Sequence, residues 1–261
     1  HGGAASDSGL SVSQRKDGTF LLTGLTSSYG QGNGDAWILA LDAQGNLLWQ
    51  RPQGGYKYEE AVHHANAADG GLLLAGFTAS KGAGGNDAWL WRADALGKPL
   101  WERTLGGVLA DEFRAVAATA EGGWVVAGTA DGDTNANSQG WLLGLDAAGQ
   151  TQWERKLGGP GSEQLRAVAA HPAGGFVAVG RTSAAPAAKG DGWILRTDPW
   201  GHTSCAAAGV CATKKALDCQ DANPCTSDTC DPIAGCVAEQ NTAPCAAGQA
   251  CTAEDVCAGG V

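Results

Sequence analysis

A polar loop in the middle of the chain places four oxygen-bearing side chains at alternate positions. These side chains belong to Asp131, Asp133, Asn135 and Asn137. Calcium takes about six to eight hard oxygen ligands, and alternation within a loop is one way to supply them. No glutamate follows at the spacing of an EF-hand, and loops rich in Asp and Asn are also common as solvated turns. The pattern therefore predicts either a calcium site or an ordinary polar turn.

A second group of oxygen-bearing side chains lies near the C-terminus and allows the same two interpretations. Its members are Asp218, Asp221, Asn223, Asp228 and Asp231. Calcium at these two places is the one cofactor that the sequence suggests, because oxygen ligands suit a hard cation.

All nine cysteines of the chain lie in the same C-terminal segment. They are Cys205, Cys211, Cys219, Cys225, Cys230, Cys236, Cys245, Cys251 and Cys257. Their spacing lacks the paired Cys-x-x-Cys pattern of metal ligands, so it favours disulfides and an oxidising, extracellular compartment. A short segment with little apolar material also needs covalent crosslinks to fold. Because nine is odd, at least one thiol has no partner within the chain. Cys205 is our candidate for that thiol, or for a link between this tail and the rest of the chain.

An acidic residue recurs at one position of an internal repeat. From the first copy to the fourth, this residue is Asp7, Glu59, Asp111 and Glu163. Catalysis needs one asymmetric group of residues, whereas a residue present in every repeat normally serves the structure. We therefore expect these carboxylates to cap turn amides. The adjacent His63 and His64 would point to opposite faces of a strand, which argues against chelation of one metal by both.

No established catalytic motif occurs in the sequence. It contains no nucleophile elbow, zinc-protease helix motif, P-loop or dinucleotide fingerprint. We therefore expect a protein that is not an enzyme. A hydrolase or lyase with an acidic cleft is the third-ranked alternative, since no acid/base pair stands outside the repeat pattern.

The repeat has a period of 52 residues and occurs four times without insertion or deletion. A Gly-Gly pair marks each copy, beginning at Gly2, Gly54, Gly106 and Gly158. Every copy then carries a tryptophan, at Trp37, Trp89, Trp141 and Trp193. Every copy also carries an aspartate, at Asp42, Asp94, Asp146 and Asp198. The copies span residues 1–53, 54–105, 106–157 and 158–204, and the cysteine-rich tail spans 205–261. Self-similarity of this kind indicates a stacked repeat architecture.

Apolar stretches and turn residues predict four strands in each copy. In the third copy they fall at residues 113–119, 124–129, 141–145 and 152–156. Four antiparallel strands in about 50 residues is the size of one propeller blade. The predicted fold class is all-β, with four copies of a four-stranded antiparallel propeller-type blade followed by a small, irregular, disulfide-rich module.

The last strand of the fourth copy departs from this pattern. The other copies carry a tryptophan there, at Trp49, Trp101 and Trp153, and the fourth carries Cys205. We therefore expect this strand to be degenerate. An incomplete blade leaves a sheet edge that is able to pair with another chain.

Two segments resemble known families. GGNDAWLWRADALGKPLWERTLGG, from Gly84 to Gly107, resembles bacterial and archaeal β-propeller repeats, which occur in extracellular and cell-surface proteins and usually in larger numbers. The resemblance covers the four copies and leaves three arrangements open: a four-bladed ring, part of a longer array, or a ring completed by several chains. DCQDANPCTSDTCDPIAGCVAEQNTAPC, from Asp218 to Cys245, resembles the short cysteine repeats of slime-mould and myxobacterial surface proteins. That second resemblance implies an extracellular stalk or surface module.

Charge narrows the range of partners. The chain has 17 Lys and Arg against 27 Asp and Glu, a formal net charge of -10. This balance argues against nucleic acid and against anionic membranes, and no apolar run approaches the roughly 18 residues of a membrane span. We expect a secreted, cell-surface structural or adhesive protein, plausibly a filament subunit, that binds itself or another surface protein. The alternative is a lectin-like module that binds carbohydrate or protein, with or without calcium.

Overall fold

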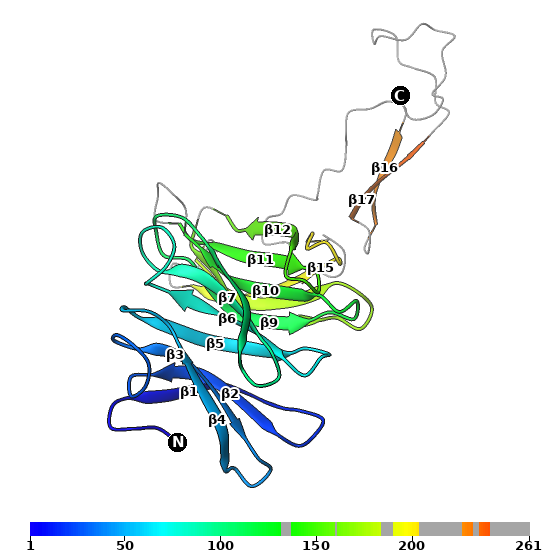
Figure 1. Cartoon of the computed structure of the whole chain (residues 1–261). Coiled ribbons are helices and arrows are strands. Elements are labelled where there is room, and N and C mark those ends of the chain that lie inside the picture. Colours follow the sequence, from blue (N-terminus) through cyan, green and yellow to red (C-terminus); the bar gives the residue numbers. More distant parts are fainter. Residues whose placement is uncertain (132–136, 160, 184–189, 204–225, 232–234, 241–261) are drawn as a thin grey trace, which may run out of the picture. The chain divides into compact units, whose positions relative to one another are not determined.

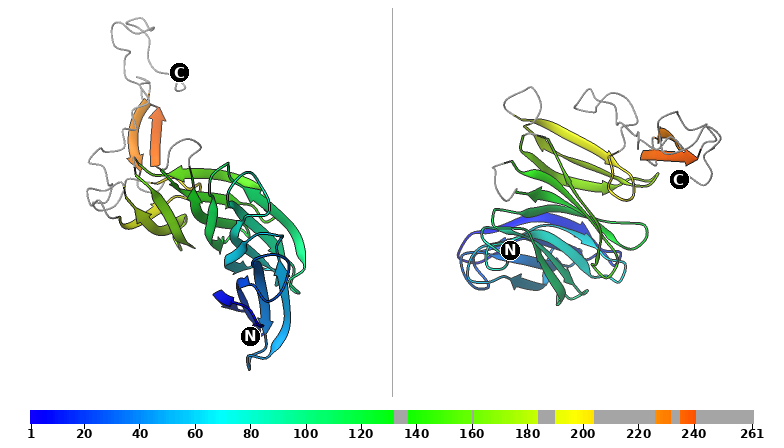
Figure 2. Two further views of the ribbon diagram at one scale, coloured as in Figure 1. Left: turned by 90° about the vertical axis from the view of Figure 1, so that its left-hand side faces the viewer. Right: turned by 90° about the horizontal axis from the view of Figure 1, so that it is seen from above.

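Each repeat forms one antiparallel sheet in the computed structural model of the chain (Figure 1). The structure describes residues 1–131, 137–159, 161–183, 190–203, 226–231 and 235–240. The chain divides into two compact units, His1–Leu195 and Arg196–Val261. We number the repeat sheets 1 to 4 in chain order, and Figure 2 shows the same succession from two further directions.

The first three sheets have four strands each, hydrogen-bonded in chain order. Sheet 1 contains β1 (Asp7–Gln14), β2 (Phe20–Thr26), β3 (Asp35–Leu41) and β4 (Leu47–Gln53). Sheet 2 contains β5 (Glu59–Asn66), β6 (Leu72–Thr78), β7 (Asp87–Ala93) and β8 (Pro99–Leu105). Sheet 3 contains β9 (Glu112–Ala118), β10 (Trp124–Ala130), β11 (Gln139–Leu145) and β12 (Thr151–Leu157). The four strands predicted for the third copy are confirmed.

Sheet 4 has three strands, β13 (Glu163–Ala170), β14 (Phe176–Thr182) and β15 (Asp191–Thr197). Beyond β15, the described residues add one isolated bridge between Thr197 and Thr203. This agrees with the degenerate last strand expected for the fourth copy. Cys205 itself lies outside the described residues.

The tail contains more regular structure than the irregular module predicted for it. β16 (Thr226–Asp231) and β17 (Gly235–Gln240) pair in an antiparallel hairpin. Both strands carry β-branched residues, which favour extended backbone. The sequence pattern missed this hairpin because the density of cysteines suggested that covalent links alone would order the segment.

A glycine in the second strand of each sheet lets the first strand bulge toward it. These glycines are Gly24, Gly76, Gly128 and Gly180. A Cβ atom at Gly24 would collide with the carbonyl oxygen of Ser8, and one at Gly128 with that of Glu112. The pairing register shifts beside these contacts in all four sheets. The repeated glycine therefore fixes the same local bend in every copy.

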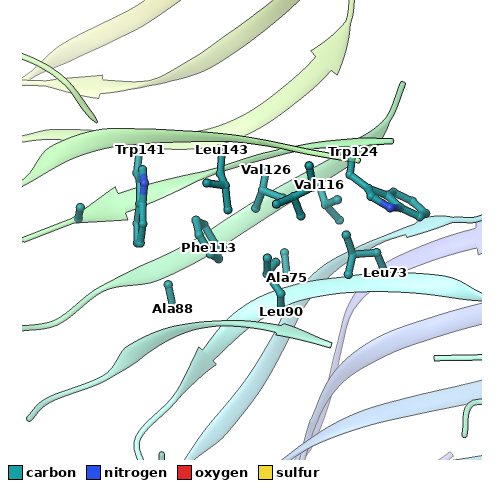
Figure 3. Packing of buried hydrophobic residues seen from close by; sticks show 12 residues of the cluster. Leu73, Ala75, Ala88, Leu90, Phe113, Val116, Trp124, Val126, Trp141 and Leu143 are labelled. Atoms are coloured by element: carbon teal, nitrogen blue, oxygen red, sulfur yellow. The ribbon is translucent and has the colours of Figure 1, made fainter. Parts of the chain in front are cut away.

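Apolar side chains from neighbouring sheets meet in a shared core. We call each such contact between two successive sheets a joint. Figure 3 shows the core between sheets 2 and 3, where Leu73 and Leu90 face Phe113, Val116 and Trp141. The joint between sheets 3 and 4 holds Leu142 against Leu165 and Trp193. The joint between sheets 1 and 2 is built in the same way. The central strands β6, β7 and β10 are buried along their whole length, because one face packs on the preceding sheet and the other on the following sheet. The strand β3 of sheet 1 is also buried along its whole length, and its residues Trp37, Leu39 and Leu41 cluster with side chains of the same sheet.

We predict that replacement by alanine lowers stability strongly at one position of the repeat and hardly at all at the equivalent position one period later. Leu142 has no exposed surface, whereas Ile194, one period later, is 71% exposed. L142A should lower the free energy of unfolding by about 2–5 kcal/mol through the cavity it leaves. I194A should change it by less than about 0.5 kcal/mol. Urea denaturation at low protein concentration measures both, and an equal loss for the two variants would show that the outer face of sheet 4 is covered within one chain.

Candidate functional site

The repeated acidic residues lie at the beginning of each first strand and accept hydrogen bonds there. Glu59 accepts from the backbone N–H of Gly55 (2.6 Å) and of Ser80 (3.0 Å) and from the Thr78 hydroxyl (3.0 Å). Glu163 repeats the pattern with the Gly159 N–H at 3.1 Å. These carboxylates cap turn amides in all four sheets, as the repetition predicted.

The two aspartates of this set show how the caps differ electrostatically. Hydrogen bonds from the Thr26 hydroxyl, the Gly3 N–H and the Ser28 hydroxyl lower the pKa of Asp7 to about 2. Asp111 is buried, and that burial raises the pKa of its carboxyl above the ordinary value, although the N–H groups of Gly107 and Asp131 oppose the shift. The difference follows from burial, because Asp7 is partly exposed and Asp111 is buried.

The backbone of the same acidic residues connects neighbouring sheets. The N–H of Glu59 donates to the carbonyl of Gly34 (3.0 Å), and that of Asp111 donates to the carbonyl of Asn86 (2.7 Å). The third joint has the same bond, from Glu163 to Ser138 at 2.9 Å. Each joint thus combines an apolar core with one backbone hydrogen bond between the two sheets.

The repeated aspartates after the third strand also serve turns. Asp42 Oδ1 accepts from the N–H groups of Gln44 and Asn46, at 2.9 and 2.8 Å. Its counterparts at positions 94, 146 and 198 accept equivalent bonds. The glycine three residues later has a positive φ in each turn, for example 84° at Gly45. These aspartates therefore maintain the turn geometry.

The repeated tryptophans Trp89, Trp141 and Trp193 fill the joints between sheets, and Trp37 packs within sheet 1. Trp37, Trp89 and Trp141 are buried and Trp193 is half-buried. The indole N–H of Trp141 donates to Glu154 at 2.9 Å, and that of Trp37 donates to Gln50 at 3.1 Å. The absent side chain of Gly140 makes room for the ring of Trp193, because a Cβ atom there would fall on that ring.

His63 and His64 point to opposite sides of sheet 2, which confirms the geometric prediction. His64 contacts the hydroxyls of Ser13 (2.7 Å) and Thr23 (3.0 Å) in sheet 1. His63 accepts from the N–H of Val116 in sheet 3 at 3.4 Å. Burial, together with the charges of His63 and Arg15, lowers the pKa of His64 from 6.5 to about 4. Both rings are therefore neutral parts of the joints near pH 7.

The predicted calcium groups fall mostly outside the described residues. In the loop of the third copy, Asp133 and Asn135 lie outside them, while the N–H of Asp131 donates to Asp111 at 3.1 Å. Burial raises the pKa of Asp131, and the charge of Glu112 raises it further. Across the part of the chain that is described, no three His, Cys, Asp or Glu side chains gather as metal ligands. Calcium binding by this loop stays a prediction.

The tail predictions can be located through β16 and β17. Asp228, Asp231 and Cys230 belong to β16, and Cys230 is the backbone partner of Cys236 in β17. The other predicted tail residues lie outside the described ranges; they are Asp218, Asp221, Asn223, Cys205, Cys211, Cys219, Cys225, Cys245, Cys251 and Cys257. The disulfide pairing therefore stays a prediction as well.

Two surfaces at the ends of the repeat stack are functional candidates that residue motifs did not reveal. The first end face belongs to sheet 1, where Leu10 and Val12 are exposed and Trp37, Leu39 and Leu41 are buried. The last end face belongs to sheet 4, and alternation along the strands places two arginines on it beside the apolar residues. Its residues are Ala167, Val177, Val179, Arg181, Gly192, Ile194 and Arg196. Val12 is 65% exposed and Ile194 is 71% exposed. Contiguous exposed apolar side chains mark interaction surfaces.

The first end face is largely covered within the chain. Its residues Trp37, Leu39 and Leu41 form a buried cluster with Phe20 and Leu22, and all five belong to sheet 1. The other three clusters each draw members from two neighbouring sheets.

Comparison with known proteins gives a local match to a family model and a distant likeness to solved structures. The model of the Dictyostelium (slime mold) repeat family matches residues 218–240, the segment that contains β16 and β17. No curated protein matches the chain. The chain is similar to the tail fiber of Staphylococcus aureus phage P68, with 10% sequence identity and a TM-score of 0.26, covering 74% of this chain and 50% of that one. It thus spans half the length of that tail fiber.

No helix of sufficient length and apolar character to cross a membrane occurs in the described ranges.

We predict that removing a repeated acid destabilises the fold. E59A should lower the free energy of unfolding by about 2–4 kcal/mol, because it leaves the buried donors at Gly55, Thr78 and Ser80 without an acceptor. The matched control is E102Q, which weakens an exposed pair with Lys81 and should cost less than about 1 kcal/mol. Chemical denaturation measures both. A loss no larger for E59A than for E102Q would contradict the structural role.

We predict a loss of stability between pH 6.5 and 5 that originates in the histidine pair. The folded-state pKa of His64 is about 4, so the unfolded chain binds a proton first as the pH falls. Stability is then complete above pH 6.5 and falls by up to about 1.4 kcal/mol per pH unit for this one group. Urea denaturation across this range measures the slope.

The control makes sheet 2 resemble sheet 3, where Ala115 and Val116 occupy the equivalent positions. The double variant H63A/H64V should show a flatter dependence on pH over the same range, whatever its stability at pH 7. An unchanged slope would assign the effect to other groups.

Proposed function

We propose that this chain is a structural or adhesive protein of an extracellular surface, and that it works as a subunit of a multi-chain assembly. The observation that carries the proposal is the exposure of Val12 on sheet 1 and Ile194 on sheet 4. Their counterparts Val116 and Leu142, at inner joints, are buried. Covering such exposed apolar side chains with a further sheet would add stability.

The roles of the repeated polar residues support a function without catalysis. The acids at positions 7, 59, 111 and 163 cap turns, and those at positions 42, 94, 146 and 198 maintain hairpin turns. Their hydrogen bonds explain their recurrence without an acid/base reaction. We propose on this basis that the protein is not an enzyme.

The extracellular setting is supported by the tail. Nine cysteines follow residue 204, which suits an oxidising compartment, and residues 218–240 match the Dictyostelium repeat. We also propose that the four sheets are propeller-type blades, since each is an antiparallel sheet ordered along the chain and packed on the next. In this scheme the repeat sheets give a rigid body and the tail acts as a stalk or linker.

Electron microscopy of the natively purified, non-reduced chain tests the proposal. Fibres, or closed particles that contain more than one chain, are the expected result, because uncovered apolar ends favour association. Mass photometry of the same preparation gives the number of chains in each particle. Particles of one chain alone at every concentration would contradict assembly and return attention to ligands at the loops.

A further inference from the structure

We propose that the carboxyl groups of Asp35 and Glu59 share one proton in acidic surroundings, and that this pair makes the joint between sheets 1 and 2 more stable as the pH falls. Asp35 begins β3, and Glu59 begins β5 of the next sheet. The pair lies inside one chain, so its behaviour does not depend on assembly between chains.

Two carboxylate oxygens from the different sheets meet at Gly54. A Cβ atom at Gly54 would collide with Oδ1 of Asp35 and with Oε2 of Glu59 alike. The backbone brings the two residues together, because the N–H of Glu59 donates to the carbonyl of Gly34, the residue before Asp35. Asp35 is 3% exposed and Glu59 is 1% exposed, so water is largely excluded from both side chains.

The hydrogen bonds of the two carboxylates leave one oxygen without a donor. Glu59 accepts three bonds, from two backbone N–H groups and one hydroxyl. Asp35 accepts a bond at Oδ2 from the N–H of Gln31 (2.8 Å), and no donor among the described residues contacts its Oδ1. A buried carboxylate beside a second one needs a positive partner. A proton taken from water supplies it, because a protonated carboxyl at Asp35 can donate to the neighbouring Oε2 of Glu59.

The charged groups around the pair do not supply this partner. In the linker that leads into β5, Lys57 is exposed. The hydroxyl of Tyr58 donates to Glu60 at 2.7 Å, so these two groups are engaged with each other. Among the described residues Asp35 forms no ion pair.

The sign of the effect follows from the pKa of Asp35. Burial raises this pKa above its ordinary value of 3.8, the N–H of Gln31 opposes the shift, and the charge of Glu59 adds to it. The folded chain therefore binds a proton at Asp35 before the unfolded chain does. Stability rises as the pH falls through the raised pKa, and the gain is complete below the ordinary value. This direction is opposite to that of His64, whose pKa is lowered.

The later joints offer a comparison within the chain. Asp87 repeats the position of Asp35 at the second joint, where it is 2% exposed and its Oδ2 has no hydrogen-bond partner among the described residues. At the third joint the same position holds Gln139, beside the capping acid Glu163. An amide carries a donor next to an acceptor, as a protonated carboxyl does. The repeat thus accepts a neutral side chain at this position.

The first test compares the wild-type chain with D35N by urea denaturation between pH 7 and 4. Asparagine has the shape of aspartate and cannot take up the proton. The ratio of the folding equilibrium constants, wild type over D35N, should be smallest at pH 7 and rise by up to about tenfold per pH unit as the pH falls. Both proteins contain His63 and His64, so the effect of the histidines cancels in this ratio.

The matched experiment introduces a carboxylate pair at the third joint. Q139D places a carboxylate beside Glu163, and Q139N is the control with the same shape and no charge. Q139D should be less stable than Q139N at pH 7, and the difference should shrink as the pH falls. Carboxyl ¹³C NMR of the wild-type chain needs no variant, and the carboxyl of Asp35 should titrate there above 3.8.

A shared proton is excluded if the ratio of wild type to D35N stays flat or falls as the pH falls, because Asp35 would then serve only as an acceptor for its loop. It is also excluded if the carboxyl of Asp35 titrates at or below its ordinary pKa. If calcium raises the melting temperature of the wild type and D35N abolishes that rise, the pair holds a cation and the shared proton is wrong. None of these outcomes changes the expected association between chains.

Discussion

The fold depends on one constraint, which is that each repeat sheet is apolar on both faces and cannot bury them by itself. The central strands β6, β7 and β10 have no exposed position, because a neighbouring sheet covers each side. Burial of apolar surface stabilises a fold roughly in proportion to the area removed from water, at about 25 cal/mol per Å². Each joint between successive sheets therefore adds to the stability of the fold.

The repeated polar residues and glycines support the packing of one sheet on the next. The acids at the start of each sheet cap turn amides where the chain enters the first strand. The backbone N–H groups of Glu59, Asp111 and Glu163 also donate hydrogen bonds to the preceding sheet. Glycines such as Gly24 and Gly140 remove side chains where a strand or a tryptophan must approach closely. The recurrence of acids, glycines and tryptophans thus describes the geometry of a joint rather than the chemistry of an active site.

Much of this architecture could be predicted from the sequence, and the parts that could not have physical reasons. The period of 52 residues located every sheet, and the replacement of tryptophan by Cys205 predicted the incomplete sheet 4, because these signals are local. The opposite directions of His63 and His64 followed from strand geometry. The exposure of Val12 and Ile194 could not be predicted, because the equivalent positions Val116 and Leu142 are buried elsewhere in the repeat. The tail hairpin was missed because β-propensity depends on packing context.

The most direct test of the account is photo-crosslinking from position 194. A benzophenone amino acid placed there reports which residues touch the last end face, and mixing chains with light and heavy nitrogen separates contacts between copies from contacts within one. The account predicts crosslinks between copies, because Ile194 is exposed in the single chain. Crosslinks confined to one chain, above all to its own residues 205–261, would contradict it, because the face would then be covered by the tail instead of a second copy.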